Sequence, residues 1–356
     1  MAAVLSPALA QEKARPRLLW QGDLRLRTQM ENDDNKDSRL VERLRLRVGV
    51  TARLQDDLTA EIRMATATGN RSANQTLGDK DGPGSSRRFI GLDVAYADWK
   101  ALPFLEVFAG RIPQFQYKAA GSEILLDDDV ALEGVGVQMQ RALNGTWSVF
   151  ANIGSLIIRE NYDSFYSEEQ TDNMLNFGQL GFSFEGDDFG VTVGGGFYNY
   201  VGLQGMNFSD IAAGATARGN SESAPGVIKN NYVPREAFVE LRRPWGSWDT
   251  QLGIEYLVNS ETNDPNQAWW VSASLGQKSW DTTFAWGQSE SDAVPSMFTQ
   301  SSFGNGQTDS RGVLVSGRWK FARGVSVRLT QMACRLKYTT DNTQYLRTHL
   351  DLSVSF

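Results

Sequence analysis

The chain has 356 residues, a formal net charge of -7 and 22% charged residues. This balance excludes a strongly basic nucleic-acid-binding protein and a disordered chain, so we expect no nucleic-acid partner. The single cysteine, Cys334, excludes a disulfide framework, and no apolar run approaches the roughly 18 residues that a membrane-spanning helix needs. No glycine-rich phosphate loop, CxxC or HExxH motif is present, so we expect no cofactor and no bound metal.

Residues 1–10 have the character of the end of a secretory signal peptide. Ala3-Val4-Leu5 is apolar, and Ala8-Leu9-Ala10 before Gln11 matches an A-x-A cleavage site. The basic segment that starts such a signal is absent, so a disordered apolar N-terminus is the alternative. We expect residues 11–356 to form a single exported domain.

Residues 40–54 alternate between apolar and polar side chains. The even positions from Leu44 to Leu54 are apolar, whereas Arg43, Arg45 and Arg47 occupy odd positions. Side chains on a strand alternate between its two faces, so the arginines share one face and the aliphatic residues the other. A soluble sandwich rarely carries such an arginine column. The pattern therefore predicts a barrel wall with lipid outside and water inside.

The same alternation recurs along the chain in segments of about 9–14 residues, the length that a tilted strand needs to cross a bilayer. It predicts an all-β fold, a transmembrane antiparallel up-and-down β-barrel of sixteen strands. The predicted strands cover residues 17–30, 39–54, 58–68, 87–99, 104–112, 131–143, 146–158, 174–185, 189–201, 231–243, 248–259, 267–277, 279–290, 309–321, 325–337 and 344–356.

The connections between these strands alternate in length. The short ones carry Asn-Gly, Asp and Gly residues typical of tight turns, and we assign them to the periplasmic side. The long ones are expected to be extracellular, and they cover residues 31–38, 69–86, 113–130, 159–173, 202–230, 260–266, 291–308 and 338–343. Aromatic residues cluster beside the short turns, as expected of a membrane-interface belt, and include Trp20, Trp99, Trp147, Trp245, Trp248, Trp280, Trp319 and Phe321.

The last strand ends on Phe356 after alternating hydrophobic residues that include Leu350, Leu352 and Val354. This ending resembles the assembly signal of bacterial outer-membrane barrels, and the whole chain resembles the sixteen-stranded general porins. The segments 110–111, 127–129 and 134–135 also resemble the so-called "Putative porin" families. The resemblance implies an integral outer-membrane protein, in contact with lipid and lipopolysaccharide, that forms homotrimers and passes small hydrophilic solutes.

The resemblance also implies that the third long loop, 113–130, folds inward and narrows the pore. Its apolar side chains, such as Phe115, Tyr117 and those of 124–126, suit packing against the inner wall. An external loop with solvated acids, or a calcium site, is the alternative. The carboxylates expected at the constriction are those of Glu123, Asp127, Asp128 and Asp129.

A basic wall is expected to face this loop, because the arginines alternate inward and the first and last strands become neighbours on closure. The wall comprises Arg25, Arg27, Arg43, Arg45, Arg47, Arg63 and Arg347. Acids on the loop and guanidiniums opposite create a transverse field with weak selectivity. Some arginines are expected to pair with nearby acids and brace the wall, and the candidates are Asp23, Glu61, Asp93 and Asp351.

A passive diffusion channel is the favoured function, and three others stay open. A channel specific for an anionic solute or acidic oligosaccharide is the first, because of the arginine columns. An outer-membrane enzyme is the second, since His349 lies two residues from Asp351. A structural barrel plugged by its own loops is the third, with loop 202–230 as a lid or a partner-binding loop.

Overall fold

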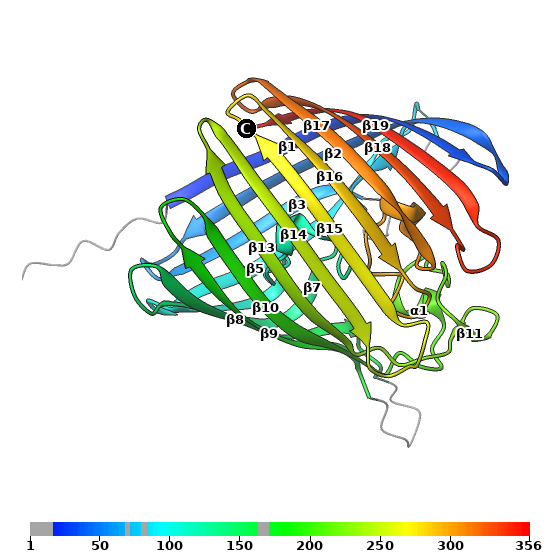
Figure 1. Ribbon diagram of the computed structural model, residues 1–356, viewed down its shortest axis with the longest axis horizontal. Helices are drawn as coiled ribbons and strands as arrows, with labels where there is room; N and C mark the ends of the chain where they lie inside the picture. Colours follow the sequence, from blue (N-terminus) through cyan, green and yellow to red (C-terminus); the bar gives the residue numbers. More distant parts are fainter. Residues whose placement is uncertain (1–16, 68–71, 80–83, 163–170) are drawn as a thin grey trace, which may run out of the picture.

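The computed structural model describes residues 17–67, 72–79, 84–162 and 171–356. Sixteen antiparallel strands close into one barrel, in which β1 pairs with both β2 and β19 (Figure 1). The strand number predicted from the sequence is confirmed, and the strand ends lie within three residues of the prediction. The expected signal segment, 1–10, lies outside the described residues.

The barrel strands are β1 (Arg17–Asp33), β2 (Lys36–Arg53), β3 (Leu58–Ala67), β5 (Phe89–Leu102), β6 (Leu105–Ile112), β7 (Leu132–Ala142), β8 (Trp147–Arg159), β9 (Asn173–Glu185), β10 (Gly190–Val201), β13 (Pro234–Trp245), β14 (Trp248–Asn259), β15 (Gln267–Gly276), β16 (Trp280–Ser289), β17 (Ser310–Ala322), β18 (Val325–Leu336) and β19 (Thr343–Ser355). Short elements in the connections are β4 (Gln75–Thr76), η1 (Ala119–Gly121), α1 (Phe208–Ile211), β11 (Glu222–Ala224), β12 (Val227–Ile228) and η2 (Phe303–Gly306). Within the described residues, none of the helical segments has the length and apolar character to span a membrane.

The strands alternate an apolar outer face with an inner face that is buried or polar. On β13, Glu236 and Glu240 are buried, whereas Val239 is 38% and Leu241 37% exposed. The same pattern leaves large aliphatic and aromatic side chains exposed around the whole barrel. Soluble proteins rarely expose contiguous apolar patches above a few hundred Å². The outer face therefore requires an apolar solvent, which a bilayer supplies.

Aromatic side chains mark the end of the barrel that carries the short turns. Trp20, Trp245 and Trp319 point outward there and are 71%, 78% and 61% exposed. Trp248 and Trp280 meet edge to face, with their ring centroids 4.7 Å apart. Indole rings favour such an interface because the ring meets lipid while its N–H stays hydrated.

The hydrophobic core lies inside the barrel, at the end that carries the long loops. It is formed where loops 113–131, 202–233 and 290–309 pack on the inner faces of the strands, with buried residues such as Leu126, Phe208 and Phe298. We call these three loops the loop cluster. Their elements α1 and β11 lie at the end of the barrel opposite the C-terminus (Figure 1).

Candidate functional site: the lumen and its inner loop

A row of amide side chains on the inner wall holds the backbone of loop 113–131. Gln138 of β7, Asn152 of β8 and Gln179 of β9 are neighbours in register and hydrogen-bond to one another. Gln138 donates to the Phe115 carbonyl at 2.7 Å. Gln179 accepts from the Tyr117 N–H at 2.8 Å and donates to the Tyr117 carbonyl at 3.0 Å. The loop backbone at Phe115 and Tyr117 is thus hydrogen-bonded to side chains of β7 and β9.

Aromatic packing fixes the same part of the loop. The Phe115 ring lies 5.6 Å from Phe108 and 5.2 Å from Phe177, measured between centroids. Tyr117 stacks on Phe150 at 5.3 Å and on a second phenylalanine, of β13, at 5.2 Å. Offset and tilted ring pairs stabilise by about 0.5–1.5 kcal/mol each beyond the area that they bury. The aromatic residues expected to pack the loop inward do contact the inner face of the strands.

The loop is fixed to a second part of the wall at Ala120. Its backbone N–H donates to Glu240 of β13, and its carbonyl accepts from Ser272 of β15 at 3.5 Å. Ala120 has a left-handed backbone, with φ 46°. Gly253 of β14 allows this approach, because a Cβ there would collide with the Ala120 methyl group. The loop therefore contacts β7–β9 at one point and β13–β15 at the other.

Two of the four candidate carboxylates are used within the loop cluster. Asp127 is buried and accepts N–H bonds from Asp129, at 2.8 Å, and from Ser301 of loop 290–309. Glu123 is partly buried, and burial together with the charges of Asp128 and Asp127 raises its pKa to about 8. The raised pKa favours the protonated form of Glu123.

The other two carboxylates are better placed to meet a solute. Asp128 is exposed. Burial and a neighbouring carboxylate raise the pKa of Asp129, and the positive charges of Arg45, Arg25 and Arg47 oppose this rise. Asp129 is thus the loop acid that interacts electrostatically with the basic wall.

The loop cluster is held together by side chains that bond to backbone groups. The Asn220 amide donates to the Val294 carbonyl at 2.9 Å and accepts from the Ser296 N–H at 2.7 Å. Asp292 accepts from the Tyr232 hydroxyl at 3.0 Å. Because loop 290–309 also bonds to loop 113–131, the three loops form one connected body inside the barrel.

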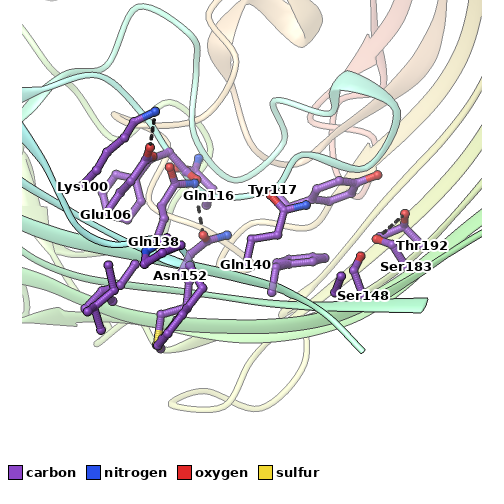
Figure 2. Close-up of a pocket in the computed structure, with 18 of the residues that line it drawn as sticks. Lys100, Glu106, Gln116, Tyr117, Gln138, Gln140, Ser148, Asn152, Ser183 and Thr192 are labelled. Atoms are coloured by element: carbon purple, nitrogen blue, oxygen red, sulfur yellow. Dashed lines mark hydrogen bonds and ion pairs between the residues drawn. The ribbon is translucent and has the colours of Figure 1, made fainter. Parts of the chain in front are cut away.

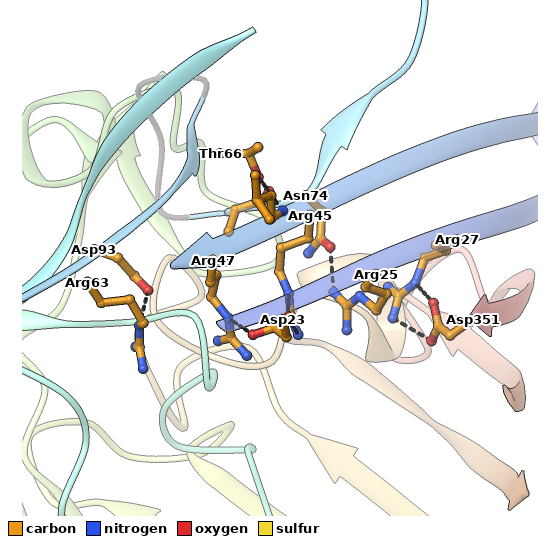
Figure 3. A network of polar contacts seen from close by, with 12 residues as sticks. Asp23, Arg25, Arg27, Arg45, Arg47, Arg63, Thr66, Asn74, Asp93 and Asp351 are labelled. Atoms are coloured by element: carbon orange, nitrogen blue, oxygen red, sulfur yellow. Dashed lines mark hydrogen bonds and ion pairs between the residues drawn. The ribbon is translucent and has the colours of Figure 1, made fainter. Parts of the chain in front are cut away.

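The arginine wall, defined as Arg25, Arg27, Arg43, Arg45, Arg47, Arg63 and Arg347, lies on β1, β2, β3 and β19. Figure 3 shows five of these arginines beside Asp23, Asp93 and Asp351. Arg27 makes two hydrogen bonds to Asp351, at 2.6 and 2.9 Å. Asp23 lies between two arginines and bonds to Arg45 at 2.8 Å and Arg47 at 2.6 Å. Arg63 pairs with Asp93 at 2.6 Å and lies 3.9 Å from Glu61. All four acids expected as partners are therefore present.

Arg347 differs from the other arginines because it anchors a loop. It donates to the Ser302 carbonyl at 3.0 Å, to Asn305 at 2.7 Å and to Glu31 at 2.8 Å. Its side chain is only 7% exposed. Arg347 thus ties loop 290–309 to the wall and offers little charge to the lumen.

The arginine wall continues beyond its seven predicted members onto β18 and β17. Arg328 of β18 lies in register with Asp351, and Arg318 of β17 lies in register with Arg328. Arg318 pairs with Asp281 at 2.6 Å. The same alternation of faces could have revealed both arginines. The position of Arg218, by contrast, could not be predicted in this way, because Arg218 lies in loop 202–233, where side chains do not alternate between two faces.

His349 and Phe356 have separate surroundings. His349 is buried, and within the described residues it makes no hydrogen bond to Asp351, whose carboxylate binds Arg27. Phe356 seals the junction of the first and last strands, where its backbone exchanges hydrogen bonds of 3.0 and 3.1 Å with Gly22.

In the part of the chain that the structure describes, no group of three or more acidic, His or Cys side chains is arranged to hold a metal ion.

Two cavities lie along the lumen. A cavity of 1120 Å³ is lined by residues 115–118 of the loop and by inner-wall residues that include Asn152, Ser183 and Thr192 (Figure 2). A cavity of 390 Å³ lies at the long-loop end beside β1, β2 and β19. The larger cavity has a mixed apolar and polar lining, whereas the smaller one is lined mainly by charged and polar side chains, which suits water and hydrophilic solutes.

The closed wall separates an apolar outside from a polar, charged inside, which is the division that a barrel in the outer membrane maintains between lipid and water. The protein is therefore an integral outer-membrane β-barrel of the porin class. Residues 15–233 and 240–348 match the family described as "Putative porin", and the chain belongs to that family.

Solved structures show the same architecture. OprB of Pseudomonas putida aligns with a TM-score of 0.59 at 10% identity, covering 95% of this chain and 94% of that one. OmpF of Salmonella typhi, solved with daunomycin, aligns with a TM-score of 0.55 at 11% identity, covering 95% and 97%. A loop L8 deletion mutant of OmpT from Vibrio cholerae aligns at 0.52 and 14%, covering 96% and 99%. At such low sequence identity, the structural similarity establishes the fold alone. No match was found among curated proteins.

Proposed function

We propose that this barrel is a passive diffusion channel for small hydrophilic solutes and ions. Solutes pass between loop 113–131 and the arginine wall. The observation that carries this proposal is the packing of loop 113–131 on the inner wall of a closed barrel whose opposite inner face bears the arginine wall. A loop held against the inner wall at two separate places narrows the lumen without closing it.

Charges of opposite sign on the loop and the wall create a field across the passage. A dipolar solute aligns in this field, whereas an apolar solute must displace ordered water to pass. The field is stronger on the basic side, because Asp127 is buried in the loop cluster and the raised pKa of Glu123 favours its protonated form. We therefore expect a weak preference for anions.

Reconstitution in planar bilayers tests the channel directly. The purified protein should give discrete, ohmic conductance steps, with a reversal potential that shifts weakly towards the anion potential in a salt gradient. Absence of steps from correctly folded protein would contradict the proposal. We further propose a homotrimer surrounded by lipid and lipopolysaccharide, in which case steps occur in groups of three and native mass spectrometry finds three chains.

The alternative of an outer-membrane enzyme has little support in the lumen. A Ser-His-Asp triad needs a carboxylate that is hydrogen-bonded to the histidine, whereas the carboxylate of Asp351 forms an ion pair with Arg27. A lipase or protease assay, with His349→Ala as the control, tests this alternative. The alternative of a channel specific for anionic solutes has a specific structural basis in the smaller cavity.

A further inference from the structure

The smaller cavity contains more basic than acidic groups. It lies where the long-loop ends of β1 and β2 face loop 290–309 and Arg218 of loop 202–233. Six cationic side chains line it: Arg27, Lys36, Arg39, Arg43, Arg218 and Arg347. Three carboxylates line it as well: Glu31, Asp33 and Asp37. Its volume of 390 Å³ lies within the range of about 300–1,000 Å³ typical of small-molecule sites.

Half of these cations have no acidic partner among the described residues. Arg27, Lys36 and Arg347 pair with carboxylates. The other three form no ion pair within the described part of the chain, and the buried Nε of Arg43 has no hydrogen-bond partner there. Arg39 and Arg218 are exposed, whereas the Nε of Arg43 is a buried donor without a partner in the described residues, which costs free energy. An acceptor from outside the chain would satisfy it.

Arg218 reinforces this arrangement from the loop side. Its guanidinium lies against Gly306, and burial together with the positive charge of Arg347 lowers its pKa. An anion between Arg218 and the strand arginines would relieve their repulsion. Guanidinium groups also match carboxylate and phosphate oxygens geometrically, because their N–H groups form a planar fork.

We propose that this cavity binds a small hydroxylated organic anion, such as a sugar acid or a sugar phosphate, before it enters the narrow part of the channel. The inference rests on the proposed channel function and names the class of solute that the channel selects. The guanidiniums of Arg43 and Arg218 receive the anionic group, and the carboxylates of the cavity receive its hydroxyl groups.

The carboxylates distinguish this class from simple anions. Asp37 makes no hydrogen bond or ion pair with any described residue, although it lines the cavity. A carboxylate beside arginines repels an inorganic anion but accepts hydrogen bonds from hydroxyl groups. A polyol that carries one acidic group satisfies both kinds of side chain, whereas acetate and glucose each satisfy one.

Binding of gluconate to the purified full-length protein in detergent, measured by isothermal titration calorimetry at low salt, tests the proposal. Gluconate should bind more tightly than acetate or glucose. Arg43→Gln and Arg218→Gln should each weaken gluconate binding about tenfold or more, the usual loss for one charge-assisted hydrogen bond. Asp37→Asn should weaken binding of gluconate but not of acetate. Arg218 lies in a loop, so its variant remains informative if the strand variant fails to fold.

Arg335→Gln is the matched control. Arg335 lies at the same end of the barrel but on the outer face of β18, and it is absent from the cavity lining. Unchanged gluconate affinity in Arg43→Gln and Arg218→Gln, or equal affinity for gluconate and acetate, overturns the inference. Equal weakening in all three arginine variants does so too, because it reduces the effect to overall charge.

The two proposals fail separately. Calorimetry in detergent reports binding whether or not the barrel conducts. A protein that conducts but does not bind gluconate retains the proposed channel and loses the inference. A protein that binds gluconate without conducting in bilayers contradicts the channel instead.

Discussion

Replacing Arg43, Arg45 and Arg47 together by glutamine should increase the preference of the channel for cations. The seven guanidiniums of the arginine wall are accompanied by five paired carboxylates, on Asp23, Glu31, Glu61, Asp93 and Asp351. The wall therefore carries an excess of two positive charges. Removing three guanidiniums removes this excess, so the local field no longer favours anions.

The size of the effect follows from Coulomb's law in water. A unit charge about 8 Å from a passing ion contributes about 0.5 kcal/mol, which screening at physiological salt reduces to about 0.2 kcal/mol. Three charges, acting in opposite senses on cations and anions, change the difference between their barriers by about 1.2 kcal/mol. The cation-to-anion permeability ratio should therefore rise roughly sevenfold, and roughly 60-fold at 10 mM salt, where screening is weaker.

The assay is the reversal potential of single channels in a tenfold potassium chloride gradient. The control variant replaces Arg311, Arg335 and Lys337, which lie at the long-loop ends of β17 and β18 with outward or loop positions, and removes the same charge. A reversal potential that is unchanged in the wall variant, or that shifts equally in the control, would falsify the placement of the conducting path beside the wall.

Three further predictions concern the loop and the closure of the barrel. Gly253→Val should displace Ala120 and raise single-channel conductance and noise, whereas Gly317→Val, whose added Cβ meets no atom within 4 Å, should leave both unchanged. The raised pKa of Glu123 means that the folded loop favours the protonated carboxyl, so loop stability falls as the pH rises from about 4.5 to about 8 and then levels off. Current noise should accordingly increase from pH 6 to pH 9, and Glu123→Gln should abolish the increase; a variant that keeps the pH dependence refutes this assignment. Deleting Phe356 removes its backbone bonds to Gly22 and should lower the yield of heat-modifiable, folded barrel on gels, while normal assembly would count against its role as an assembly signal.

The sequence predicts the wall of this protein well, because the wall is governed by local rules. Alternation of faces placed Arg43, Arg45 and Arg47 inward, and the same rule placed Asp23 opposite Arg47 and Asp351 opposite Arg27. Turn residues and the alternation of loop lengths fixed the strand ends. The structure confirms all sixteen predicted strands. The prediction succeeded because these rules act locally along the chain.

The loops could not be predicted in the same way. Asp127 belongs to a run of three acids that suggests a solvated surface, yet it is buried by contacts with loop 290–309, far away in sequence. No periodicity or residue spacing in the sequence predicts such a contact. Arg218 enters the basic cavity for the same reason, through the packing of loop 202–233. Non-local loop contacts are visible only once the barrel brings the loops together.

The mutual docking of loops 113–131, 202–233 and 290–309 separates two properties of this protein. Strand number and the aliphatic outer face determine how the barrel fits its membrane, whereas in the proposed channel the length and packing of three loops determine how wide the passage is. Insertions or deletions in those loops can therefore alter which molecules enter the cell without changing any side chain that meets the bilayer. Permeability and membrane anchoring are consequently free to evolve, and to be engineered, independently.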